Sequence, residues 1–277
     1  MFENRTILIV TKHQKERVIA PFFSEHFNSN CIVSNHFDTD TLGTFCGEVD
    51  RKDDPISTLR KKCILGLKNT NWDIAIASEG SFGSHPIMFM APFSEEYMML
   101  YDQKNQIEII AKESTTDTNF DERVVKNIDE LLDFAKKTKF PSHGLILKTM
   151  EGEAIVIKGI VALDELKSSF ERLSKTSTTI LALTDMRAQF NPTRMEVIKR
   201  LAQKLILKIQ STCEQCSYPG FDIEEVKKGL PCEMCNMPTE SSLAHIKRCK
   251  QCSFEKIIWH PNSKKFEAPM YCNFCNP

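Results

Sequence analysis

The sequence predicts an α/β protein with a mixed-sheet N-terminal domain, residues 1–210, followed by a small cysteine-rich C-terminal domain, residues 211–277. Three observations support this prediction. Short apolar runs rich in β-branched residues alternate with amphipathic segments, which is typical of α/β domains. Two strand-like runs flank the turn Asp102-Gln103-Lys104-Asn105, so at least one antiparallel pair is expected. Eight of the 11 cysteines form C-x-x-C pairs beyond residue 210.

The individual elements follow from the spacing of apolar residues. Strands are expected at Thr6–Thr11, Cys31–Ser34, Asp73–Ser78, Tyr97–Asp102, Gln106–Ala111, Gly144–Lys148, Ala154–Ile160 and Thr178–Thr184. Helices are expected over His13–Phe27, Asp54–Leu67, Asp121–Lys137, Asp164–Leu173 and Asn191–Gln210. Asp54 and Pro55 form an N-cap and first-turn proline, and Cys63 falls on the inner face of that helix. The last helix is expected to join the two domains.

The composition excludes several classes of protein. Hydrophobic residues make up 41% of the chain and charged residues 26%, as in an ordinary globular protein. The formal net charge of -1 excludes a polybasic protein, so a polyanion would need a local basic patch. No signal-peptide pattern and no apolar stretch of ~18 residues is found. We therefore expect a cytoplasmic protein that has no membrane span and whose cysteines are thiols or metal ligands.

The C-x-x-C pairs are the strongest signal in the sequence. Their members are Cys213, Cys216, Cys232, Cys235, Cys249, Cys252, Cys272 and Cys275. Eight thiolates complete two tetrahedral Cys₄ sites, so the sequence predicts a double zinc-ribbon domain with two zinc ions. Four protein ligands leave no open position on the metal, which indicates a structural role. Redox pairs, disulfides or an iron–sulfur cluster are the weaker alternatives.

Each C-x-x-C pair forms one cysteine knuckle, and the sequence allows more than one way of joining the four knuckles in two sites. The string Cys213-Glu-Gln-Cys-Ser-Tyr resembles Cys249-Lys-Gln-Cys-Ser-Phe, which indicates a duplicated ribbon. This favours pairing the first knuckle with the second and the third with the fourth. A nested arrangement, with the outer knuckles together and the inner knuckles together, stays open. The stretch Ser241–Phe266 is basic and contains Trp259, so nucleic-acid binding through the tail is an alternative to an ordinary solvated face.

Polar strings in the first domain follow the expected strands, where α/β sheets place ligands. They are Thr11–Lys15, Asp38–Glu48, Ser78–Pro86 and Thr184–Arg187. Each string alone suits an ordinary turn or helix cap. Together they supply acids for Mg²⁺ and cations for phosphate. The candidate acids are Glu48, Glu79 and Asp185, and the candidate cations are Lys12, Lys15, Arg187 and Arg194.

At these strings the chain resembles an uncharacterised bacterial family with a domain of unknown function. The similar segments are Asp38–Asp40, Gly43–Glu48, Ser78–Gly83, Thr184–Ala188, Asn191–Met195 and the cysteine tail. That resemblance implies no activity. The chain also has a fainter resemblance to the inosine/xanthosine triphosphate pyrophosphatases, at Thr11-Lys12-His13 and Glu79-Gly80. Those enzymes have an Asn in place of His13, and their second lysine is shifted by one position.

These patterns lead to two functional hypotheses. The first is a Mg²⁺-dependent phosphohydrolase acting on a nucleotide or related phosphate compound, in which the cations hold phosphate and the acids hold metal or orient water. The second is a non-catalytic module that senses a small ligand and contacts nucleic acid or protein through its tail. Cys46 is also a candidate nucleophile beside His13 or His85, but the sequence shows nothing that activates its thiol.

Overall fold

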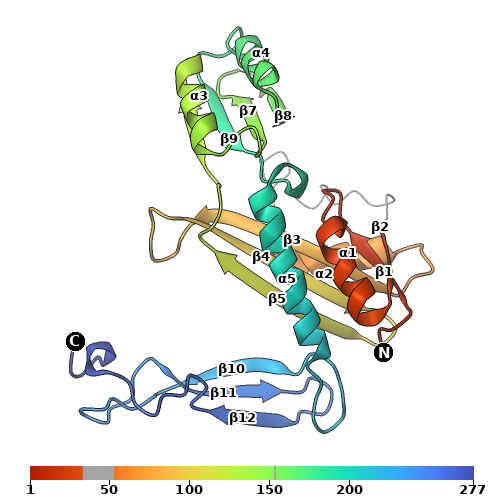
Figure 1. Ribbon diagram of the computed structural model, residues 1–277, viewed down its shortest axis with the longest axis vertical. Coiled ribbons are helices and arrows are strands. Elements are labelled where there is room, and N and C mark those ends of the chain that lie inside the picture. The colour runs from red at the N-terminus through yellow and green to blue at the C-terminus, as the bar shows by residue number, and fades with distance from the viewer. Residues whose placement is uncertain (34–52, 153) are drawn as a thin grey trace. The chain divides into compact units, whose positions relative to one another are not determined.

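The structure is a computed structural model that describes residues 1–33, 53–152 and 154–277. The chain forms two compact units, Met1–Ile206 and Leu207–Pro277. The first contains a five-stranded and a four-stranded sheet, and the second contains a three-stranded sheet (Figure 1). This mixed α/β architecture with a small C-terminal antiparallel sheet confirms the predicted fold class.

The five-stranded sheet is mixed. In spatial order its strands are β2 (Asn30–Val33), β1 (Thr6–Val10), β3 (Ile74–Ser84), β4 (Pro92–Asp102) and β5 (Ile107–Thr115). The first three run parallel, whereas β4 is antiparallel to both of its neighbours. Helix α2 (Pro55–Leu67) packs on one face, and α1 (Glu16–Phe27) and α5 (Pro192–Gln210) lie on the other (Figure 1). Cys63, on the inner face of α2, is fully buried, which confirms its expected place in the core.

The four-stranded sheet is antiparallel throughout. Its strands are β6 (Glu122–Val125), β9 (Ile180–Thr184), β7 (Leu145–Thr149) and β8 (Val156–Ile160), in that order. Helices α3 (Ile128–Lys137) and α4 (Leu163–Leu173) cover it, with Phe134 and Phe170 among the core residues. The prediction of a helix over Asp121–Lys137 was wrong for the first part of this range, which forms strand β6. The helix begins later because Asn127 accepts the Glu130 amide while Glu130 accepts the Lys126 amide, a reciprocal helix cap.

Strand β3 is longer than expected, since it runs to Ser84 rather than ending at Ser78. The glycine-rich string after Ser78 therefore lies within a strand and not in a turn, because β4 pairs with it along its whole length. Strand β1, which pairs with β3 on its other side, ends opposite Ala77. Residues from Ser78 onward lie beyond the carboxyl end of β1, which is where open sheets place ligands.

The C-terminal unit is a meander of β10 (Asp222–Lys228), β11 (Ser242–Arg248) and β12 (Glu255–Trp259). Both strand pairs are antiparallel. The described part of the chain also contains two short 3₁₀ helices, Ala188–Phe190 in the first unit and Pro269–Tyr271 in the second. Within the described ranges, no helix has the length and apolar character needed to cross a membrane.

Candidate functional site

The eight tail cysteines form two clusters in which the four sulfur atoms lie within 4.8 Å of one another. One cluster is Cys213, Cys216, Cys249 and Cys252, and the other is Cys232, Cys235, Cys272 and Cys275. The Sγ–Sγ distances that link different knuckles are 3.7 and 3.5 Å in the first and 3.9 and 3.6 Å in the second. These separations are too long for disulfides, whose sulfurs lie about 2.05 Å apart.

The clusters fit two zinc ions. A tetrahedral site with Zn–S bonds of about 2.3 Å places its sulfurs about 3.8 Å apart, close to the distances in both clusters. Each knuckle has the same turn, in which the residue after the second cysteine donates its amide to the carbonyl of the first; an example is Ser217 to Cys213 at 2.8 Å. Amide donors also reach two of the sulfurs, from Gln215 to Cys213 and from Met234 to Cys232, each at 3.4 Å.

The favoured pairing of consecutive knuckles was wrong, and so was the nested alternative. The first knuckle joins the third, and the second joins the fourth. The meander explains this arrangement, since each spacer between knuckles contains one strand. Asp222 and Glu255 both pair with Arg248 at one end of the sheet, whereas Lys228 pairs with Ser242 toward the other. Successive knuckles therefore alternate between the two ends.

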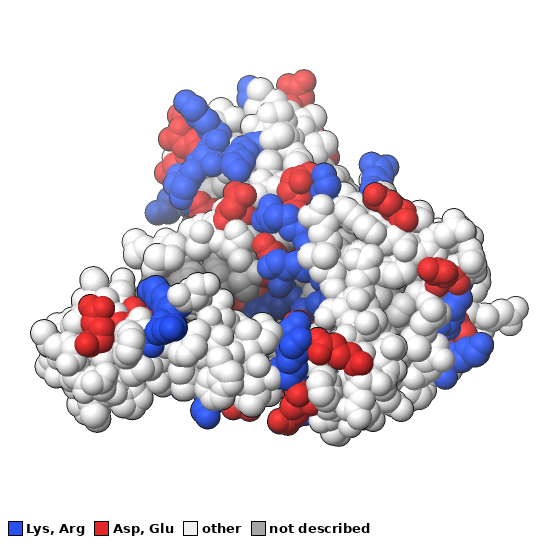
Figure 2. Space-filling view, turned by 60° about the horizontal axis from the view of Figure 1, so that its bottom comes forward, with Lys and Arg blue, Asp and Glu red and all other residues white. Residues whose placement is uncertain are grey.

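Three of the six cations in the basic stretch of the tail lie beside acids of the tail. Arg248 lies within ion-pair distance of Glu224 and Glu255, and Lys256 pairs with Glu214. Lys264 also has a carboxylate partner within the tail, 3.3 Å from its Nζ. In Figure 2 most of the visible face is uncharged, and in several places Lys and Arg side chains lie beside Asp and Glu side chains. These ion pairs reduce the positive charge that the stretch offers to a nucleic-acid backbone.

The N-terminal unit contains a buried cation cluster at the carboxyl end of β1. Lys15 lies at the start of α1, is 6% exposed, and its Nζ lies 2.9 Å from the Ser78 Oγ and 3.4 Å from the Ser78 carbonyl oxygen. Neither oxygen is charged, and no carboxylate of the described residues lies within ion-pair distance of Lys15. Burial, reinforced by the charge of Arg194, lowers the pKa of Lys15 to about 7.

Arg194 is the second cation of the cluster and enters from the first turn of α5. Its Nε donates to Glu96 Oε1 at 2.6 Å, and its Nη1 donates to the Met186 carbonyl oxygen. Both side chains of this ion pair are almost fully buried. Gly80 permits the close approach, because a Cβ at that position would lie 2.3 Å from Glu96 Oε1 and 2.6 Å from Arg194 Nη2.

Glu79 completes the cluster on the side of α2. The Lys62 Nζ lies 2.5 Å from Glu79 Oε2, and both side chains are about nine-tenths buried. The pKa of the Lys15 ammonium responds to the charges of four neighbours, namely Lys62, Glu79, Glu96 and Arg194. The five residues are three cations and two acids, so together they carry a formal charge of +1 when Lys15 is protonated. This excess of buried positive charge favours an anionic ligand.

The structure thus brings together three of the predicted residues, Lys15, Glu79 and Arg194. Asp185 instead forms a buried ion pair with Arg187, and it also accepts the Gly159 amide at 3.1 Å. This pair is linked to the cluster through backbone groups. The Met186 carbonyl accepts from Arg194, and the Asn191 side chain bridges the Asp185 carbonyl and the Arg194 amide. Lys12 is exposed in the turn before α1. The string Asp38–Glu48, with Glu48 and Cys46, lies outside the described residues.

Sequence reasoning missed Glu96, Lys62 and the role of Ser78. The alternation of residues along its strand indicates that Glu96 is buried. Ser94, Met98 and Leu100 lie on the same side of the strand as Glu96, and all three are buried. An acid on the buried side of a strand needs a cationic partner. Lys62 carries a similar signal, because it lies beside Cys63 on the inner side of α2.

Comparison with known proteins gives a family but no activity. The model of the family described as a domain of unknown function (DUF6671) matches residues 62–277. No curated protein matches the chain. Among solved structures, protein VC0702 from Vibrio cholerae is similar, with 10% sequence identity and a TM-score of 0.34 over 78% of this chain and 99% of that chain. Because the family match covers more than half of its length, the chain belongs to the DUF6671 family.

Proposed function

We propose that the N-terminal unit binds a nucleotide or related phosphate compound at the cation cluster and hydrolyses it with Mg²⁺. The observation that carries this proposal is Lys15, a buried ammonium whose hydrogen bonds within the described residues go to the neutral oxygens of Ser78. Burying a cation without a counter-charge is unfavourable, and a bound phosphate would supply that charge. Arg194 and, from the neighbouring turn, Lys12 are the further phosphate ligands in this proposal.

Glu79 is the described acid best placed to assist hydrolysis. Mg²⁺ at phosphate-binding sites commonly uses one or two carboxylates together with phosphate oxygens. Glu79 would exchange its bond to Lys62 for the metal or for the attacking water when a phosphate compound arrives. Glu48 is proposed as a further metal ligand. Asp185, held by Arg187, would position the Met186 carbonyl that binds Arg194.

Glu79→Gln is expected to lower kcat for phosphate release by about 100-fold or more, because an amide cannot act as a base or bind Mg²⁺ strongly. Phosphate release would be measured over a panel of nucleotides and phosphate monoesters. Glu108→Gln is the matched control, since Glu108 pairs with Arg60 in a more exposed position. Mg²⁺ should be withheld rather than chelated, because a chelator would also remove zinc. A Glu79→Gln enzyme as active as the Glu108→Gln control would contradict this role.

Sulfate binding is expected to weaken as the pH rises above about 7. Lys15 must be protonated to bind a dianion, and with its pKa at about 7 the affinity should fall by about tenfold per pH unit. Sulfate keeps a constant charge in this range, so the slope reports the protein. Lys15→Met should bind weakly at all pH values. Equal slopes for the two proteins, measured by titration calorimetry, would refute the assignment.

The same pKa shift affects stability with a definite sign. The unfolded chain holds the lysine proton up to about pH 10.4, whereas the folded chain releases it near 7. Between these values the unfolded state binds more protons, so this group makes the free energy of unfolding rise with pH.

The non-catalytic module is the second proposal, and one observation favours it. Large apolar side chains are exposed around the second cysteine cluster, namely Met234, Met237, Met270, Tyr271 and Phe274. The tips of the first cluster carry polar residues such as Gln215 and Gln251 instead. If the zinc-loaded protein hydrolyses no member of the panel, the enzyme proposal fails and the binding module remains.

A further inference from the structure

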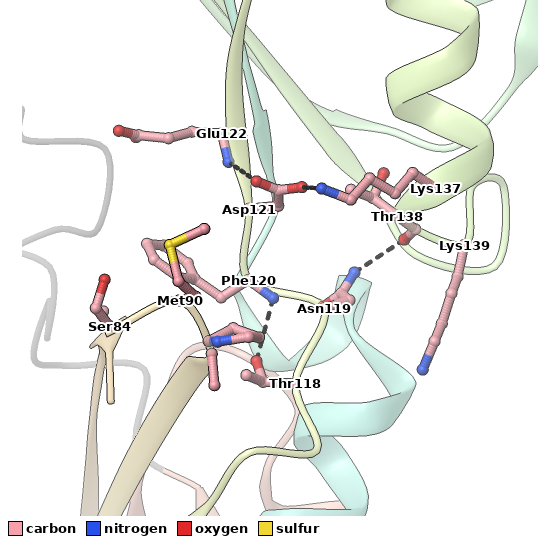
Figure 3. A pocket seen from close by; sticks show the side chains of 13 residues that line it. Ser84, Met90, Thr118, Asn119, Phe120, Asp121, Glu122, Lys137, Thr138 and Lys139 are labelled. Atoms are coloured by element: carbon pink, nitrogen blue, oxygen red, sulfur yellow. Dashed lines mark hydrogen bonds and ion pairs between the residues drawn. The ribbon is translucent and has the colours of Figure 1, made fainter. Parts of the chain in front are cut away.

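A pocket of about 600 Å³ lies at the end of the β3–β4 hairpin (Figure 3). Its walls come from three segments of the N-terminal unit: the hairpin end, the connection from β5 to β6, and the C-terminal end of α3. Pockets that bind small molecules have volumes of roughly 300–1,000 Å³. The pocket is therefore large enough for an organic ligand.

The walls of the pocket are fixed by hydrogen bonds. Asn119 donates to the Thr138 carbonyl oxygen at 3.0 Å, and the Phe120 amide donates to the Thr118 hydroxyl at 3.2 Å. An ion pair of 2.7 Å between Lys137 and Asp121 joins α3 to the β5–β6 connection (Figure 3). These bonds hold the connection in place, so this part of the pocket is formed before a ligand arrives.

The pocket shares one face of β3 with Lys15 and Arg194, whereas Glu79 lies on the opposite face, toward Lys62 of α2. Alternate residues of a strand point to the same side, so Gly80, Phe82 and Ser84 face the same way. Gly80 lies against Arg194, and Ser84 lines the pocket. At ~3.3 Å per residue, the four steps from Gly80 to Ser84 span about 13 Å, the length of an extended organic phosphate.

Phe82 connects the two regions. The Arg194 guanidinium carbon lies 5.0 Å from the centre of the Phe82 ring, and the Phe82 and Phe120 rings are 5.9 Å apart. Phe120 in turn lines the pocket. A continuous row of a cation and two aromatic rings therefore leads from the cluster into the pocket.

The lining of the pocket selects for a flat group with polar edges. Phe120 and the exposed thioether of Met90 offer aromatic and polarisable surface. Lys139 offers a donor, since within the described residues its Nζ makes a single hydrogen bond, to the Thr193 hydroxyl at 3.4 Å. Sugar and glycerol groups could accept from Lys139 but could not stack on Phe120, so ring stacking is what favours an aromatic group.

We propose that this pocket binds the organic group of the phosphate compound and that this group is aromatic or heteroaromatic. The inference rests on the proposed function, because it assumes that phosphate is held at Lys15 and Arg194. It adds the class of substrate, an aryl or heteroaryl phosphate rather than a sugar or glycerol phosphate.

The test is titration calorimetry on the full chain without Mg²⁺, so that no probe is hydrolysed. The probes are inorganic phosphate, glycerol 3-phosphate, 1-naphthyl phosphate and adenosine 5′-monophosphate. The two aromatic probes are expected to bind about tenfold more tightly than the other two, since stacking on aromatic side chains contributes at this level. Ser84→Trp, at an exposed position, should fill the pocket and remove this advantage, while the affinity for inorganic phosphate stays unchanged.

Ser84→Ala is the matched control and should bind all probes as the unmodified protein does. Met90→Ala removes one apolar wall at a side chain that is 99% exposed, and it should reduce the aromatic advantage severalfold without affecting the fold. Equal affinity for aromatic and aliphatic phosphates, or an aromatic advantage unaffected by Ser84→Trp, would overturn the inference and leave the proposed function intact. Failure to bind any phosphate would overturn both.

Discussion

Removal of zinc from the full chain is expected to unfold residues 207–277 and leave the N-terminal unit folded. The tail buries few large apolar side chains, with Phe221 between Cys213 and Cys249 at the centre of its core. Structural zinc sites contribute roughly 10–16 kcal/mol of apparent binding free energy, which exceeds what such a core supplies. Hydrogen exchange with and without a chelator would measure this. Protection of β10–β12 that survives complete loss of metal would contradict the expectation.

Double cysteine variants test which knuckles share an ion. The unmodified chain should hold two zinc ions, and Cys213→Ser should hold one. Adding Cys249→Ser should remove no further zinc, because both residues belong to the first cluster. Adding Cys232→Ser instead should remove both ions. If the Cys213→Ser/Cys232→Ser protein retained one zinc, consecutive knuckles would share a site and the interleaved arrangement would be wrong.

Arg194→Met is expected to destabilise the N-terminal unit by about 3–5 kcal/mol. The substitution leaves the Glu96 carboxylate fully buried without its cation, which is the costly way to break a buried ion pair. Urea unfolding followed by Trp72 fluorescence, in a Trp259→Phe background, would report this unit alone. Arg194→Met/Glu96→Gln should recover part of the loss, because both charges are then removed.

Arg200→Met provides the comparison on the same helix. Arg200 pairs with Glu113 but its side chain is 42% exposed, so its loss should change stability by at most about 1 kcal/mol. Similar effects of the Arg194 and Arg200 substitutions would mean that the cluster is not a buried charged site.

The zinc ligands were predictable from sequence because the C-x-x-C spacing is set by local geometry. Which knuckles share an ion depends on the path of the chain between them. The similar strings at Cys213 and Cys249 suggest two ribbons in series, but in the structure they supply the two halves of one cluster. A prediction of one antiparallel strand in each of the three spacers would have placed successive knuckles at opposite ends of the sheet, and so would have indicated the observed pairing.

The N-terminal unit shows a similar division between local and long-range information. The proline-started helix at Pro55 and the apolar stripe of α5 depend on nearby residues, and both helices lie where they were expected. Strand β6 and the second half of β3 depend on pairing with β9 and β4, which no local pattern shows. In the candidate site, Lys15 and Arg194 stand out near helix starts, but Glu96 is about 100 residues away from Arg194 and only the fold joins them.

A crystal structure with tungstate, a tetrahedral dianion with strong anomalous scattering, would test the central claim most directly. We predict an anomalous peak within hydrogen-bond distance of the Lys15 Nζ, with Arg194 on its other side. A tungstate complex in which every anion lies elsewhere, and Lys15 still donates only to Ser78, would contradict a phosphate site at this cluster.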